Sequence, residues 1–306
     1  MKTITQVYKL AFLCAAMLIT THLLAKDDRS EKNKAYTKSY SISSSDNISI
    51  ENKFGETRLE IWSNNEVKVE VQIKVKASSE AKAQQLLDDI TIEDGKGGNG
   101  VYFKTKIDHN DRGDKRGNTE MEINYLVHLP ANNPLHLDAQ FGKAFVPDYK
   151  GPVDITSKFG ELTAGNLANV KELDVQFGKA NIESINNGNI KVGYSGFSIK
   201  RLTGDIEAKF DFCDGGNIAI DNSIKSFTMH NNYSTIKITT SKDISASFDI
   251  QTHFGDFNNR TDFTIKDEDK DDDSRGPKFD YHYVGKAGSG NIMVKIKSNF
   301  GTTTIN

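Results

Sequence analysis

Apolar and polar residues alternate in short stretches along most of this chain. Clear examples are residues 67–75, 120–129, 137–146 and 173–182. A period of two predicts β-strands that bury one face, provided that another layer covers that face. The sequence therefore predicts an all-β protein.

One segment has a different period. Ala83, Leu86 and Leu87 form an apolar face at helical spacing within residues 80–89, and Ser78 or Ser79 can cap the first turn. We expect one helix here, inserted in the N-terminal part.

The dipeptide Phe-Gly recurs within similar frames of alternating residues. Three central copies begin at Phe141, Phe159 and Phe177, each 18 residues after the last, and others begin at Phe54, Phe254 and Phe300. Degenerate copies at Tyr194, Phe210 and Tyr233 fill the gap at irregular spacing. Glycine after the aromatic residue permits the positive φ of a sharp turn. We expect an aromatic ladder of Phe54, Phe141, Phe159, Phe177, Tyr194, Phe210, Tyr233, Phe254 and Phe300, facing inward as core rather than serving as a platform for ligand stacking.

This repeat predicts a single-stranded β-solenoid, similar to a β-helix, or a closely related twisted β-stack. Coils stacked at about 4.8 Å bring equivalent aromatic residues into register. A β-propeller needs blades of about 40 residues, more than twice this period. A hexapeptide β-helix needs an aliphatic residue at every sixth position, and no such register is present.

The pattern predicts a leader followed by three segments. Residues 1–25 are expected to be a signal peptide, 26–45 a flexible lead-in, 46–135 a β-rich region with the helix, and 136–306 the solenoid repeats. An acidic insertion is expected near residues 264–278.

The expected signal peptide has Lys2 and Lys9 as its only charges, then an apolar run that ends at Ala25 before Lys26. The run is shorter than the roughly 20 residues that span a bilayer, which favours a cleaved export signal over an anchor. Cys14 could indicate a lipoprotein, but Leu13 before it is too bulky for a lipidation motif. We therefore expect Cys14 to be removed with the signal peptide. We expect no transmembrane segment in the mature chain, and a location in the periplasm, on the outer-membrane surface or outside the cell.

Charge and cysteine content restrict the possible partners and the possible cross-links. Removing Lys2 and Lys9 from the 39 basic residues leaves 37 against 42 acidic ones, a net charge of −5. That balance argues against a nucleic-acid partner, which needs a basic surface. Cys213 is then the only cysteine, so no intrachain disulfide is expected.

These features together resemble the bacterial "putative adhesin" β-solenoid families of exported proteins in Gram-negative bacteria. The shared elements are the export signal, the early coil that ends in Phe54-Gly55, the single helix before the repeats, and the turn Gly288-Ser289-Gly290 that opens the strand at Asn291. The resemblance spans about Ile48 to the end. It implies a non-catalytic surface or periplasmic protein with an adhesive role, and it carries no active site to transfer.

Two acidic groups are candidate sites. Asp211, Asp214 and Asp221 are the best carboxylate cluster for a carbohydrate-active enzyme on a β-helix, although Asp214 before Gly215-Gly216 is better explained as a turn residue. The run that contains Asp267, Asp269, Asp271 and Asp273 offers oxygen ligands for Ca²⁺, but it lacks the glycine and later glutamate of an EF-hand, so a solvated insertion is favoured.

The remaining candidates favour a structural interpretation. No histidine lies at a spacing from Cys213 that would indicate a nucleophile, and Cys213 is expected to be a core or half-exposed thiol. The histidines lack metal-binding spacing and are expected to be scattered on strands and surface: His109, His128, His136, His230, His253 and His282. No cofactor is expected.

The sequence thus predicts an exported, non-catalytic binding scaffold whose partner is an unknown envelope glycan or protein. The alternatives are the carbohydrate-active enzyme and a structural envelope protein that self-associates through its end coils, where sheet edges are unpaired.

Overall fold

The structure, a computed structural model, describes residues 29–108, 119–268 and 277–306. The expected signal peptide at 1–25, His109, Asp269, Asp271 and Asp273 lie outside the described residues. Within them the chain is all-β with a single helix, α2 (Glu80–Asp88), and its strands belong to one 21-stranded sheet. No helix in these ranges is both long and apolar enough to cross a membrane.

The strands in chain order are β1 (Ser30–Ser41), β2 (Asn47–Lys53), β3 (Glu56–Ile61), β4 (Glu66–Ala77), β5 (Ile90–Gly97), β6 (Gly100–Ile107), β7 (Glu120–Leu129), β8 (Leu135–Gln140), β9 (Lys143–Val146), β10 (Tyr149–Lys158) and β11 (Glu161–Gln176). They continue with β12 (Lys179–Gly193), β13 (Gly196–Asp211), β14 (Asp214–Asn232), β15 (Thr235–Thr240), β16 (Ala246–His253), β17 (Asp256–Asn259), β18 (Thr264–Asp267), β19 (Asp280–Lys286), β20 (Ile292–Asn299) and β21 (Thr302–Ile305).

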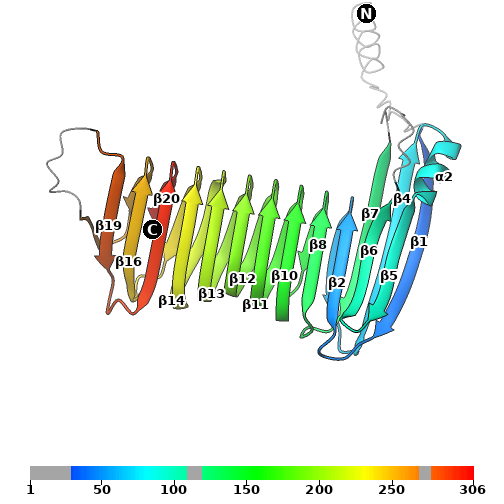
Figure 1. Cartoon of the computed structure of the whole chain (residues 1–306), viewed down its shortest axis with the longest axis horizontal. Coiled ribbons are helices and arrows are strands. Elements are labelled where there is room, and N and C mark those ends of the chain that lie inside the picture. The colour runs from blue at the N-terminus through cyan, green and yellow to red at the C-terminus, as the bar shows by residue number, and fades with distance from the viewer. Residues whose placement is uncertain (1–28, 109–118, 269–276) are drawn as a thin grey trace, which may run out of the picture.

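The middle of the molecule is a parallel stack of successive turns of chain (Figure 1). Parallel pairs run from β2 to β8, β10, β11, β12, β13 and β14 in that order. Buried and outward positions alternate along these strands, as in β10, where Val153 and Ile155 face a continuous apolar interior. We call this arrangement the parallel stack, and one level of it a rung.

The C-terminal rung is not at the end of the stack. β20 pairs in parallel with β14 on one side and with β16 on the other, and β21 lies likewise between β15 and β17. The last segment of the chain is therefore inserted between two rungs formed earlier in the sequence. Figure 1 shows the C-terminus inside the stack for this reason.

Antiparallel strands cover both ends of the parallel stack. At one end β5 pairs with β6, β4 with β7, and β1 with β4, while α2 packs against β1 and β4. At the other end β19 pairs with β16, and β18 with β19. Among the described strands, four pair with only one neighbour: β1, β5, β17 and β18. Three of these edge strands, β1, β5 and β18, are antiparallel covering strands, and β17 belongs to the parallel stack. Self-association through the ends stays a prediction.

The expected flexible lead-in at 26–45 is wrong for most of its length. Ser30 to Ser41 form β1, which pairs residue by residue with β4 from Ala77 to Glu66. Two tyrosines hold this strand in place: the hydroxyls of Tyr36 and Tyr40 both donate hydrogen bonds to the Asp94 carboxylate on β5, Tyr36 at 2.6 Å. The polar composition of β1 concealed it, because only these two rings pack against the core.

The Asp94 carboxylate makes the N-terminal end sensitive to acid. Burial alone would raise its pKa, but the hydrogen bonds from Tyr36 and Tyr40 and the charge of Lys38 outweigh this and hold the pKa below its usual value. A depressed carboxyl pKa stabilises the fold above the unfolded-state value near 3.9, and that contribution is lost as the pH falls through the folded-state pKa.

We therefore expect Asp94→Asn to cost about 1 kcal/mol at pH 7 and much less near pH 2. Urea unfolding at both pH values measures the difference, and the double variant Tyr36→Phe, Tyr40→Phe should reproduce it. An equal cost of Asp94→Asn at both pH values would contradict this account.

Candidate functional site: an exposed aromatic ladder

Nine aromatic rings form one continuous column along the parallel stack. Neighbouring ring centroids are 4.8–5.1 Å apart and their planes differ by 1–9°. In spatial order the members are Phe54, Phe141, Phe159, Phe177, Tyr194, Phe212, Tyr233, Phe300 and Phe254. We call this column the ladder. Phe279 stacks on Phe254 at 4.4 Å and extends the column at the C-terminal end.

The ladder lies on the outside of the protein, so the expectation that its aromatic residues face inward is wrong. Its rings from Phe141 to Phe254 are 45–52% exposed, and Phe54 is half-buried. The reason is local. Each ladder residue has a φ between 49° and 63°, and this left-handed residue interrupts the alternation of the strand before it. A ring that period-two counting places inside is therefore turned outward.

The glycine after each ring has a different role from the expected one. The aromatic residue, not the glycine, adopts the positive φ. A Cβ on Gly142, Gly160 or Gly178 would lie 1.7–2.0 Å from the carbonyl oxygen of the equivalent glycine one rung away. In these three rungs glycine is needed because backbones approach closely at the corner. Ser195, Cys213 and Ser234 take the same position in three rungs, and all three are buried.

Backbone hydrogen bonds continue through this corner without a break. The Phe159 N–H donates to Gln176 O at 2.9 Å, and the Phe141 N–H donates to Lys158 O at the same distance. The bonding holds the left-handed residues in a conformation that costs about 1–2 kcal/mol for a non-glycine residue. Ring stacking, about 0.5–1.5 kcal/mol per pair, offsets part of that cost.

Phe210 does not belong to the ladder, and Phe212 takes its place. Phe210 is fully buried and stacks inside on Phe197 at 4.5 Å, while Phe212 lies 4.9 Å from both Tyr194 and Tyr233. A signal was present in the sequence. Ladder phenylalanines follow a polar outward residue, as Phe212 follows Asp211, and the residue after them is small, here Cys213.

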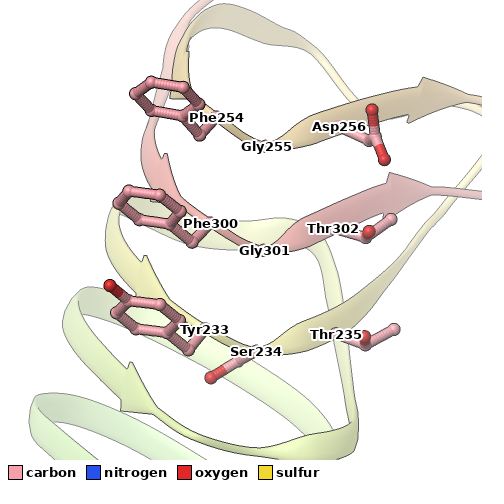
Figure 2. A pocket seen from close by; sticks show the side chains of 9 residues that line it. All are labelled: Tyr233, Ser234, Thr235, Phe254, Gly255, Asp256, Phe300, Gly301 and Thr302. Atoms are coloured by element: carbon pink, nitrogen blue, oxygen red, sulfur yellow. The ribbon is translucent and has the colours of Figure 1, made fainter. Parts of the chain in front are cut away.

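A shallow groove of about 180 Å³ runs beside the ladder at its C-terminal end. Figure 2 shows the rings of Tyr233, Phe300 and Phe254 as one wall, with the backbone of the turn as floor and a parallel column of Thr235, Thr302 and Asp256 beyond it. The groove is open to solvent. It suits contact with an extended surface better than enclosure of a small molecule.

The structure places the three candidate catalytic aspartates in separate interactions. Asp211 pairs with Lys209 at 3.1 Å and accepts a hydrogen bond from Asn232. Asp221 pairs with Arg201 at 3.2 Å, while Asp214 is exposed at the start of β14. Asp267, the described aspartate of the acidic run, lies 3.8 Å from Lys278.

Of the five described histidines, four lie beside carboxylates: His128, His136, His253 and His282. His136 lies 3.5 Å from Asp154, and His282 lies 3.0 Å from Asp249 and 3.3 Å from Glu268. His253 contacts Asp280 in a polar hollow of about 310 Å³ next to the ladder. In the part of the chain that the structure describes, no three of His, Cys, Asp and Glu are grouped so that they could hold a metal ion.

Cys213 lies at the ladder corner with its side chain inside. The thiol is within 3.3 Å of Val192 O, and burial raises its pKa. A buried thiol with a raised pKa is a poor nucleophile at neutral pH.

No protein-family model and no curated protein matches this sequence. Several solved structures resemble it over most of their length at low identity. A putative cell adhesion protein from Clostridium sporogenes has a TM-score of 0.27 and 13% identity, covering 90% of this chain and 99% of its own. A putative adhesin from Bacteroides fragilis has a TM-score of 0.37 and 13% identity, covering 89% and 97%. A putative lipid binding protein from Parabacteroides distasonis has a TM-score of 0.33 and 8% identity, also covering 89% and 97%.

Proposed function

We propose that this protein is an exported, non-catalytic binding scaffold of the cell envelope or surface, built as a single-stranded β-solenoid, and that the ladder is its binding surface. The parallel rungs, their shared apolar interior and the covering strands at both ends support the solenoid assignment. The basic and apolar sequence of residues 1–25 supports export. The division into a β-rich N-terminal region and repeats from about residue 136 belongs to the same proposal.

The observation that carries the proposal is the unbroken apolar strip that the ladder exposes. A large aromatic side chain has roughly 200 Å² of surface, so nine half-exposed rings present on the order of 900 Å². The largest apolar patch on a typical monomer is about 300–600 Å² and often functional. The left-handed conformation of all nine residues adds to the argument, because strained backbone persists where the surrounding structure enforces it and gathers at functional sites.

The geometry of the rings favours a protein partner over a stacked sugar. A sugar would lie on a ring face, but both faces of each inner ring are covered by neighbours at about 4.9 Å. The ladder therefore offers ring edges, which carry the positive part of the aromatic quadrupole. Apolar side chains, carbonyl oxygens and other ring faces complement such edges.

The test is a binding screen of the purified protein against envelope glycans, extracellular-matrix proteins and immobilised copies of itself, with each bound ligand checked for chemical change. We expect saturable binding of an unaltered protein ligand. In the double variant Phe159→Asn, Phe177→Asn the affinity should fall at least tenfold, while asparagine retains the left-handed backbone. Met293→Asn is the matched control, since Met293 is 52% exposed and lies off the ladder. Turnover of a ligand, or binding unaffected by the double variant, would reject the proposal.

A further inference from the structure

The centre of the ladder lacks the side chains that flank its rings elsewhere. Tyr194 is the fifth of nine rings, with Gly193 before it and Gly196 two residues after it. Lys179 and Thr235 occupy the position of Gly196 in other rungs. A Cβ on Gly196 would meet only Asp214 O, at 3.9 Å, so the fold itself does not require glycine here. A bare position at the midpoint of an apolar strip allows another surface to approach closely.

The two columns of residues beside the ladder divide by charge at the same midpoint. These columns hold the residue before each ring and the residue two after it, and the strand register aligns them on either side of a bulge at Asp214. Alongside the first four rings they contain four lysines and two glutamates: Lys53, Lys143, Lys158 and Lys179 with Glu56 and Glu161. Alongside the last four they contain three aspartates and no lysine: Asp211, Asp214 and Asp256. One half of the strip carries a net charge of +2 and the other half −3 with His253 neutral.

The size and spacing of the strip suit a second copy of the same chain. Nine rings expose on the order of 900 Å², and a stable interface buries about 800 Å² on each partner. A second ladder has the same rung spacing, so rings remain matched along the full length of the contact. An interface of this kind is isologous, with the same patch on both subunits.

We propose that two copies of this chain pair ladder to ladder, antiparallel, about a two-fold axis that passes beside Tyr194. This inference rests on the proposed function, since it names the partner of the ladder. The antiparallel arrangement places the basic half of each strip against the acidic half of the other, with Lys179 opposite Asp214 of the second copy. A parallel arrangement would put like halves together, a juxtaposition that costs affinity.

A substitution of Gly196, at the centre of the ladder, tests the proposed pairing most directly. Gly196→Lys gives this rung the side chain that Lys179 already has in the neighbouring rung, so the fold should tolerate it. At the two-fold axis, however, it places two cations near each other and holds the copies apart. The matched control is Thr239→Lys, an exposed position on β15 roughly 20 Å along the strand from Tyr233 at 3.3 Å per residue.

Sedimentation equilibrium at micromolar concentration should give twice the 34.0 kDa of the full chain, or twice that of the processed chain. We expect Gly196→Lys to weaken association at least tenfold and Thr239→Lys to leave it unchanged.

Mixing Lys143→Cys with Thr302→Cys chains should produce an oxidised cross-link that neither chain forms alone, because the antiparallel axis brings these two positions together.

A monomer at all concentrations, or a dimer that withstands Gly196→Lys, would overturn the inference. The screen with Phe159→Asn, Phe177→Asn separates this failure from failure of the proposed function. A monomer that binds another protein through its ladder would reject only the second copy as partner. Binding that is unaffected by that double variant would reject the ladder as a binding surface.

Discussion

Gly160→Ala is expected to destabilise the protein by about 3 kcal/mol or more, because an added methyl has no space in this rung of the ladder corner. Its Cβ would lie 1.9 Å from Gly142 O, a rigid backbone atom whose carbonyl also accepts the Glu161 N–H bond. Relief would require two rungs to separate, and the stacks of Phe159 with Phe141 and Phe177 would be disturbed together. Chemical denaturation of the purified variant measures the loss.

The matched control for this prediction is Gly98→Ala. Gly98 is exposed, and a Cβ there would have no neighbour within 4 Å. Its effect should stay within about 0.5 kcal/mol, as for most surface substitutions. Equal costs at the two glycines would show that backbone approach at the corner does not matter to stability.

Deleting residues 288–306 is expected to unfold the C-terminal rungs. The deletion removes β20 and β21, which pair with β14 and β15 on one side and with β16 and β17 on the other. Val294, Ile296 and Ile305 are fully buried, and at about 2 kcal/mol each their loss removes roughly 6 kcal/mol of hydrophobic stabilisation. Asn231 would also lose its bonds to Ser298 and Thr303.

Hydrogen exchange measures this prediction rung by rung. Amides of β16 and β19 should lose protection, whereas those of β10 and β11, several rungs away, should keep most of theirs, since each rung contacts only its neighbours. A synthetic peptide of residues 288–306 added in trans should restore protection in β16. Unchanged protection in β16 of the truncated chain would contradict the inserted arrangement.

Several features of the fold were accessible from the sequence because they depend on neighbouring residues. Period-two alternation predicted the strands, and the helix expected at 80–89 is found at Glu80–Asp88 with Ser79 as its N-cap. The recurrence of Phe-Gly indicated that equivalent residues would stack. For the strands and the helix the cause lies within a few residues, where side-chain period and capping chemistry act.

The tertiary structure decided where the rings point and which rungs are neighbours. The left-handed conformation of the ladder residues is imposed by hydrogen bonds from adjacent rungs, so counting along one strand places the rings on the wrong side and selects Phe210 over Phe212. Several strands have a similar alternation and could pair in parallel with β20. Only the pairing across the whole stack places β20 between β14 and β16. Likewise, β1 is a strand because β4 and Asp94 hold it, while its own residues are too polar to indicate a buried face.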